Sequence, residues 1–190
     1  MVRILIRVVA SVALIGAAYL LLVNAALNLP ATQALINQTL GGRIVVHWER
    51  AWSLVPFRLT IEGLKVTGQS WSQQFAVTVP RITGGVDVPS LLSRTLRFND
   101  VETGNLVVRF RPRPRPDKDD GDLRPYYPEI PGFDPELAAD PVPTQSPGWL
   151  TEFEVTSIGG SNDLWFAANR LTLVGEVSGM ISLPNFAPAA

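Results

Sequence analysis

Hydrophobic positions along the chain follow two different patterns. The first is an uninterrupted apolar run over residues 8–29, where 22 residues pass without a charged side chain. At about 1.5 Å per residue the run makes about 33 Å of helix, enough to cross a hydrocarbon core about 30 Å thick. We therefore predict a cytoplasmic stub and a transmembrane helix over residues 1–29.

Positive charge flanks this run on one side only. Arg3 and Arg7 precede it, and the next Lys or Arg is Arg43. Because Lys and Arg accumulate on the cytoplasmic side of a span, the N-terminus is expected in the cytoplasm and the bulk of the chain across the membrane. A cleaved signal peptide is the alternative, with small residues at 25–26 as its cleavage region. The length of the run favours an uncleaved anchor.

After the apolar run, the pattern predicts one short helix and then strands. A connecting helix is expected over residues 30–42, starting at Pro30 and stopped by Gly41 and Gly42. From residue 43 apolar and polar side chains alternate with a period of two, which is typical of strands with one apolar face. The alternation changes phase at Gly63, where we expect a β-bulge. Strand segments over 43–110 and again over 149–190 predict a meander of short antiparallel strands.

A Pro-rich segment interrupts the strands. Residues 111–148 contain ten of the 16 prolines, and such a segment donates few hydrogen bonds to a sheet. We predict a flexible insertion with polyproline II character between paired strands. The arginines that enter it could touch lipid headgroups, but the acidic residues beside them favour a solvated run; they are Arg109, Arg111, Arg113 and Arg115.

Composition excludes several classes of function. A formal net charge of −1 does not suit a nucleic-acid partner, and the absence of cysteine excludes disulfides and thiolate chemistry. His47 is the only histidine, and the sequence contains no nucleophile elbow, no phosphate-binding loop and no metal-ligand pair. We therefore expect no enzyme, no catalytic residues, no metal and no cofactor.

Three stretches resemble a known family. Residues 52–69 read WSLVPFRLTIEGLKVTGQ, and residues 91–109 read LLSRTLRFNDVETGNLVVR, each as a turn followed by strands. Near the C-terminus a third stretch is marked by Trp165, Arg170, Gly175, Gly179, Leu183 and Pro184. Placed after an N-terminal apolar helix, these stretches resemble the N-terminal portion of AsmA-like and TamB-like proteins of the Gram-negative envelope.

The resemblance implies a fold and a function. It implies a mainly β protein whose strands form a curved groove or half-barrel after the transmembrane helix, with the Pro-rich loop inserted. The anchor would lie in the inner membrane, and the periplasmic groove would hold lipid acyl chains for phospholipid transport or outer-membrane homeostasis. The groove residues would be Leu59, Ile61, Leu64, Val66, Phe75, Val77, Val79, Leu96, Phe98, Leu106, Val108 and Phe110.

Two alternatives stay open at the level of sequence. The same alternation describes a closed β-sandwich, because periodicity alone does not show whether an apolar face is covered. The chain could also be an anchored scaffold that docks a protein partner through its Pro-rich loop.

About ten strands at about 4.8 Å span only about 50 Å, so an envelope partner or a homo-oligomer is expected if the groove bridges two membranes.

Overall fold

The N-terminal part of the molecule consists of two helices. The structure is a computed structural model that describes residues 2–40, 44–70, 73–113, 125–133 and 150–184. The helices are α1 (Val2–Asn28) and α2 (Pro30–Thr39), separated by the extended backbone of Leu29. Over Ile6–Asn28, α1 is long and apolar enough to cross a membrane. Both helices expected from the sequence are therefore present.

The remaining elements form a single sheet of ten strands. A short 3-10 helix, η1 (Pro89–Ser93), connects the fourth strand to the fifth. The strands are β1 (Ile44–His47), β2 (Arg50–Val55), β3 (Arg58–Gln69), β4 (Gln73–Asp87), β5 (Thr95–Gly104), β6 (Val107–Pro112), β7 (Leu150–Gly159), β8 (Ser161–Phe166), β9 (Asn169–Val174) and β10 (Val177–Pro184).

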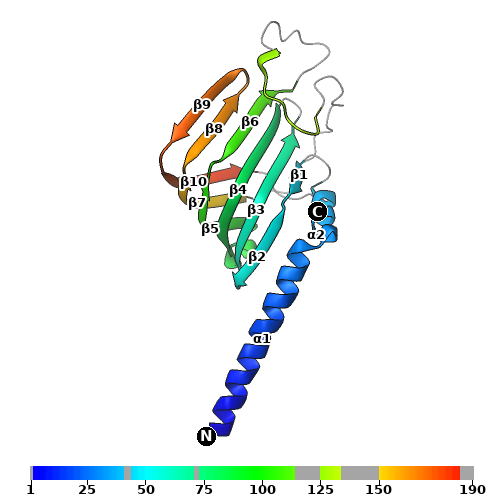
Figure 1. Cartoon of the computed structure of the whole chain (residues 1–190), viewed down its shortest axis with the longest axis vertical. Coiled ribbons are helices and arrows are strands. Elements are labelled where there is room, and N and C mark those ends of the chain that lie inside the picture. The colour runs from blue at the N-terminus through cyan, green and yellow to red at the C-terminus, as the bar shows by residue number, and fades with distance from the viewer. Residues whose placement is uncertain (1, 41–43, 71–72, 114–124, 134–149, 185–190) are drawn as a thin grey trace.

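Several strands follow one another end to end in the same row of the sheet. β1 and β2 both pair with β3, and β5 and β6 both pair with the long strand β4 on its other side. β7 and β8 form the next row, and β10 and β9 form the last. The sheet therefore runs from an edge of β1 and β2, beside the helices, to an edge of β9 and β10 (Figure 1).

Two pairings are parallel, β5 with β7 and β6 with β8. Parallel neighbours need a crossover of a dozen or more residues, because the chain must return to the same end of the sheet. Here the chain leaves β6 at Pro112 and enters β7 at Leu150, so the Pro-rich segment makes this crossover. The predicted mainly β fold with an N-terminal apolar helix is confirmed, and the antiparallel meander is interrupted by this parallel step.

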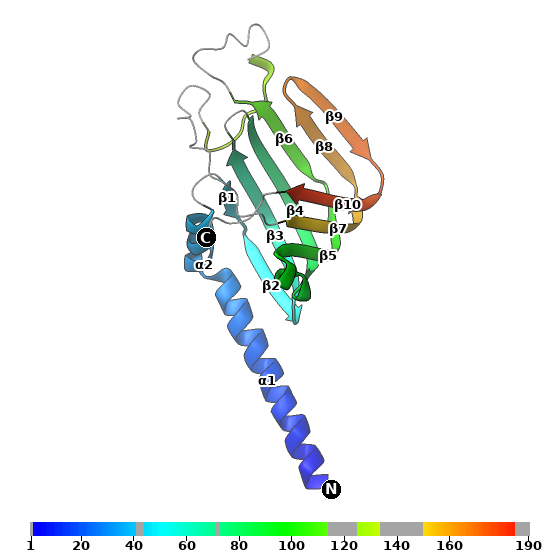
Figure 2. The ribbon, with the colours of Figure 1, turned by 180° about the vertical axis from the view of Figure 1, so that it is seen from behind.

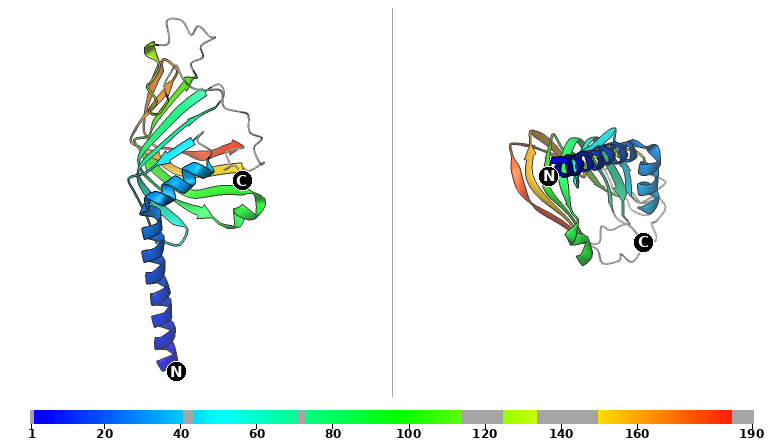
Figure 3. Two further views of the ribbon diagram at one scale, coloured as in Figure 1. Left: turned by 90° about the vertical axis from the view of Figure 1, so that its right-hand side faces the viewer. Right: turned by 90° about the horizontal axis from the view of Figure 1, so that it is seen from below.

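The sheet is curled into a half-barrel. Seen along the long axis of the molecule, its strands follow an arc, with the two helices along one side (Figure 3). From behind, β2 points along α1, and η1 lies at the same end of the sheet (Figure 2). Within the described residues all ten strands belong to this one sheet, so no second sheet covers either face.

β3 bends at Gly63 without gaining a residue. Gly63 has a φ of +62°, and a Cβ there would lie 2.5 Å from side-chain carbons of Glu49. Both facts favour glycine, which alone adopts this conformation at little cost and leaves room for Glu49. Glu62 pairs with Arg81 and Leu64 with Val79, so the register is unchanged across the bend. The predicted bulge was wrong: Gly63 forms a left-handed kink without an extra residue. Ile61 lies beside Ile82 and Leu64 beside Val79, so strand alternation puts Ile61 and Leu64 on opposite faces of the sheet.

Candidate functional site

Seven of the twelve predicted groove residues lie together around β4. The register places Val66 of β3 beside Val77 of β4, and Val77 beside Val108 of β6. Directly opposed side chains on one face of a sheet have Cβ atoms about 4.5–5.5 Å apart, so these valines form a continuous apolar row. We call this surface the apolar face; its other predicted members are Leu64, Phe75, Val79 and Phe110.

The remaining predicted residues lie beyond the kink at Gly63, toward η1. Phe98 of β5 is opposite Phe153 of β7, and their rings stack with centroids 5.0 Å apart and planes inclined by 8°. This stacked pair is the centre of a second apolar group. The other predicted residues in this half of the sheet are Leu59, Ile61 and Leu96. Leu106 lies at the β5–β6 junction.

Two phenylalanines belong with these groups but were not predicted. Phe166 of β8 is opposite Phe110, and the centroids of the two rings are 6.2 Å apart. Phe153 lies between Glu152 and Glu154, an alternation that marks a strand with one apolar face. The sequence signal was therefore present for Phe153, whereas its pairing with Phe98 depends on the parallel crossover.

The predicted groove residues are not enclosed in a core. Val79 is buried at 3% exposure, and the other eleven are partly exposed. In a closed sandwich the facing sheet would bury such positions, because stacked sheets interdigitate their inner side chains. The buried apolar side chains of the described residues are few and mostly scattered; they are Trp48, Ala51, Ala76, Val79, Val101, Ile130 and Val155.

The opposite face near β6 is covered by part of the Pro-rich segment. Arg111 is opposite the fully buried Gln74 and donates a hydrogen bond to Gln74 Oε1 at 2.9 Å. It also donates to the carbonyl oxygens of Pro128 and Phe133, each at 3.1 Å. Arg111 thereby fastens residues 125–133 onto the sheet.

This arrangement overturns the prediction for the arginine run. Arg111 and Arg113 are each only 4% exposed, and Arg109 is partly exposed. A solvated run was predicted because acidic residues follow in the sequence. Instead the guanidinium of Arg111 donates hydrogen bonds to carbonyl oxygens of residues 125–133, and these bonds offset the cost of burying its charge. Arg115 lies outside the described residues.

The other distinctive site joins the helices to the sheet edge through side-chain amides. Asn24 accepts a hydrogen bond from the Ser53 N–H at 2.8 Å and donates to the Ser53 carbonyl at 3.1 Å. Asn28 makes the same two bonds with Ala51, at 3.2 and 2.7 Å. A carboxamide carries one acceptor and donors, as a peptide group does, so each Asn replaces a peptide of a neighbouring strand.

The same arrangement continues in α2. Asn37 accepts from the Val46 N–H at 2.7 Å and donates to the Val46 carbonyl at 3.0 Å. Gln33 donates to the Trp48 carbonyl at 2.9 Å, and Trp48 Nε1 donates to the Leu27 carbonyl at 3.0 Å. These contacts place α2 against the start of the sheet. We call the four residues Asn24, Asn28, Gln33 and Asn37 the amide ladder.

Helix and strand geometry explain why the amide ladder fits. Four helical residues rise about 6 Å, and two strand residues advance about 6.6 Å. Amides four positions apart in a helix therefore match alternate residues of an antiparallel strand, as the pairs of Asn24 with Ser53 and Asn28 with Ala51 show. The ladder protects an edge that would otherwise expose unpaired backbone groups.

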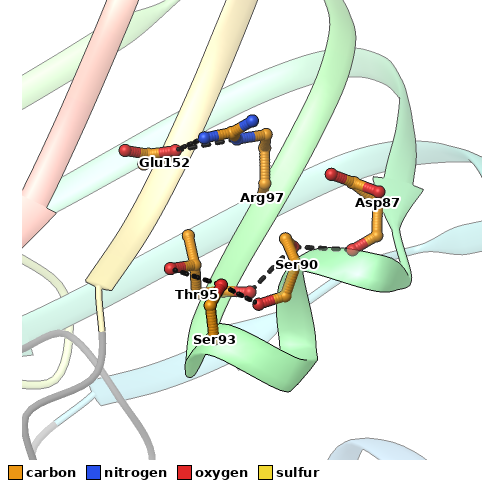
Figure 4. A network of polar contacts seen from close by, with 6 residues as sticks. All are labelled: Asp87, Ser90, Ser93, Thr95, Arg97 and Glu152. Carbon is orange, nitrogen blue, oxygen red and sulfur yellow. Dashed lines mark hydrogen bonds and ion pairs between the residues drawn. The ribbon is translucent and has the colours of Figure 1, made fainter.

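A polar network fixes η1 at the end of the sheet toward which β2 points (Figure 4). Ser90 Oγ is within hydrogen-bond distance of the carbonyl oxygens of Asp87, at 2.7 Å, and Thr95, at 2.8 Å. Arg97 donates from Nε to Glu152 at 2.8 Å, and this hydrogen bond raises the pKa of Arg97 above its ordinary value. The network links the end of β4, the start of β5 and the start of β7.

His47 and Asp163 each have hydrogen-bond partners on neighbouring elements. His47 Nδ1 lies 2.9 Å from Gln33 Oε1, next to the amide ladder. Asp163 accepts hydrogen bonds from Arg170 at 2.7 Å and from Thr172 at 2.8 Å, and these bonds hold its pKa below its ordinary value. Among the described residues no group of His, Asp and Glu is placed to hold a metal ion.

Fold and site together define a class of molecule: a curled single-layer half-barrel, partly exposed on its apolar face and joined at one edge to an apolar helix of membrane-spanning length. Comparisons with protein families, with curated proteins and with solved structures give no match.

Proposed function

We propose that the protein is a single-pass envelope protein that binds lipid acyl chains on the apolar face of its half-barrel. In this proposal it is anchored in the inner membrane by α1 and contributes to phospholipid transport or outer-membrane homeostasis, as the resemblance to AsmA-like proteins implies. The observation that carries the proposal is the partial exposure of six of the seven residues of the apolar face, all but Val79. Exposed apolar surface of this extent is typical of a binding surface.

The size of the sheet suits an acyl chain. On β4 the apolar face extends from Phe75 to Val79, which at about 3.3 Å per residue is about 13 Å. One leaflet of a hydrocarbon core is about 15 Å thick, so the face is about as long as the space that an acyl chain occupies in a bilayer. Acyl chains need no hydrogen bonds from their site, which matches a face of Val, Leu and Phe.

Orientation follows from the charges at the helix. Arg3 and Arg7 favour a cytoplasmic N-terminus, and the sheet then lies on the periplasmic side. The amide ladder holds the sheet edge against the C-terminal turns of α1. In the proposed arrangement the edge of the sheet formed by β2 therefore lies at the membrane that supplies the lipid.

Photo-crosslinking tests lipid occupancy of the apolar face. A photoreactive amino acid replaces Val108 or its neighbour Val107 in the full chain, reconstituted in vesicles with radiolabelled phosphatidylethanolamine. Val108 is opposite Val77 on the apolar face, whereas Val107 is opposite Thr78 on the other face. We expect crosslinked lipid at 108 to exceed that at 107 by about tenfold. Equal labelling at the two positions, or none at 108, would refute the proposal.

A charge substitution distinguishes an open face from a closed core. Val77→Asp places a carboxylate on the apolar face, and we expect it to reduce crosslinking at 108 several-fold while the protein keeps its fold. If the face were a closed core, a buried unpaired carboxylate would cost several kcal/mol and unfold the sheet. The matched control is Thr78→Asp on the opposite face, expected to change neither folding nor crosslinking.

A further inference from the structure

The end of the half-barrel beside α1 carries a cluster of exposed large apolar side chains. Leu54, at the end of β2, is 72% exposed, Phe57 in the β2–β3 turn is 63% exposed, and Leu92 in η1 is 94% exposed. Val55 and Val88 are also exposed. The Val86 N–H donates to the Phe57 carbonyl at 2.7 Å, which brings the end of β4 to the level of the turn. We call these five residues the apolar rim: Leu54, Val55, Phe57, Val88 and Leu92.

Hydrogen bonds fix the level of this rim along α1. Asn28 bonds Ala51, and Asn24, four residues earlier in α1, bonds Ser53. β2 therefore runs toward the N-terminus of α1, and two strand residues correspond to about one helical turn. Tyr19 also reaches Ser53, with 2.7 Å between the hydroxyl oxygens. One further step places Val55 level with about residue 20 of the helix. The rim therefore lies beside the middle of the candidate span, Ile6–Asn28.

The length of helix below the rim is too short to cross a bilayer. From Arg3 to Leu20 the helix rises about 25 Å. From Val8, which follows the last arginine of α1, to Leu20 it rises about 18 Å. A hydrocarbon core is about 30 Å thick. If α1 spans the bilayer, the rim must enter the far leaflet by about 5–12 Å. That range agrees with the depth of about 5–10 Å at which interfacial apolar elements bind.

Polar groups at this end of the molecule fit such an insertion. Backbone groups in lipid must be satisfied within the protein, and the amides of Asn24 and Asn28 satisfy the N–H and C=O of Ser53 and Ala51. Arg58 directly follows Phe57 and forms an ion pair with Asp100 at 3.8 Å, and the exposed Arg94 follows η1. Long arginine side chains can extend to phosphate groups while their stems lie along apolar surface, so they limit the depth of the rim.

We infer that the apolar rim is a second membrane-embedded element, inserted into the far leaflet beside α1. The rim then lies among the acyl chains of that leaflet, at the same end of the sheet as the stacked pair Phe98 and Phe153. The inference deepens the proposed function: it rests on α1 spanning a bilayer, but it does not require lipid on the apolar face.

Single-cysteine labelling tests the inference cleanly because the chain has no cysteine. Leu54→Cys, Phe57→Cys and Leu92→Cys, each labelled with an environment-sensitive fluorophore, are reconstituted as full chains in phosphatidylethanolamine and phosphatidylglycerol vesicles. The control is Gln73→Cys, exposed at the opposite end of β4. We expect lipids with a nitroxide on the acyl chain to quench the rim labels at least fivefold more than the control, and aqueous iodide to show the reverse order.

Two results would overturn the inference. Rim labels that iodide quenches as strongly as the Gln73→Cys control would place the rim in water. An extraction test with alkaline carbonate separates this failure from failure of the anchor: a chain retained in the membrane with water-exposed labels refutes the rim alone. A chain released by carbonate refutes both the anchor and the inserted rim. Thermal unfolding of each labelled variant confirms that its sheet is intact.

Discussion

The amide ladder makes a strong prediction about how the helix and the sheet are joined. Asn24→Ala removes the acceptor for the Ser53 N–H and the donor to the Ser53 carbonyl. Ser53 is 4% exposed, so water reaches its backbone groups poorly. A buried backbone group without a partner costs about 1–3 kcal/mol. We expect Asn24→Ala to lower the free energy of unfolding by about 2–4 kcal/mol.

Thermal unfolding in lipid nanodiscs is a direct assay. Trp48 donates to the Leu27 carbonyl at the same junction, so tryptophan fluorescence reports its loss. For a chain of this size about 1 kcal/mol corresponds to about 2–4 °C, which converts the expected loss into a Tm decrease of about 4–16 °C. Gln38→Ala, at an exposed position of α2, controls for the substitution itself. Its Tm is expected to stay within about 2 °C of the wild type.

The result that would refute this reasoning is equal Tm values for Asn24→Ala and Gln38→Ala. That outcome would mean that the amide does not stabilise the strand edge. The positions of α1 and β2 could then vary independently, and the level of the apolar rim would no longer follow from the helix. The same measurement therefore also examines a premise of the inserted rim.

Two further predictions concern the far part of the sheet. Arg111→Met removes the hydrogen bonds to Gln74, Pro128 and Phe133. We expect chymotrypsin to cleave this variant at Tyr126 or Tyr127 several-fold faster than the control Arg109→Met, which changes a partly exposed arginine. Equal cleavage of the two variants would contradict the role of Arg111 in fastening residues 125–133. The pKa of Asp163 is lowered in the folded state, so ionised Asp163 stabilises the fold at pH values above its ordinary pKa of about 3.9. This contribution is lost as the pH falls from about 4 through the lowered pKa of the folded state. Asp163→Asn should therefore lower Tm at pH 7 and converge with the wild type near pH 2, whereas a constant difference in Tm would argue against the linkage.

Local patterning was sufficient to predict the class of fold. An uncharged run of 22 residues predicts the apolar helix, and alternation with a period of two predicts the strands that carry Val66, Val77 and Val108. These signals depend only on residues close in sequence, which is why they can be read directly. The neighbours of these strands across the sheet were less predictable, because a register depends on which strands meet.

The parts that sequence reasoning missed are long-range contacts. Asn24 and Asn28 lie near the end of the apolar run, and nothing in the local pattern indicates that they bond residues more than 20 positions away. The parallel step brings Phe153 beside Phe98 after a connection of 37 residues between β6 and β7. Arg111 was expected in solvent because the segment that buries it is itself poor in regular structure.

The hydrogen bonds at the junction also bear on the two interpretations of the apolar helix. Cleavage within residues 25–26 would remove Tyr19 and Asn24, which bond Ser53, and would separate Asn28 from the helix that positions it. The backbone groups of a buried edge residue would then lose their partners, at a cost comparable to that predicted for Asn24→Ala. A single-layer sheet with few buried apolar side chains has little stability to offset this loss. Retention of α1 would keep these partners, because α1 completes the edge of the sheet, and over Ile6–Asn28 it is long and apolar enough to cross a membrane.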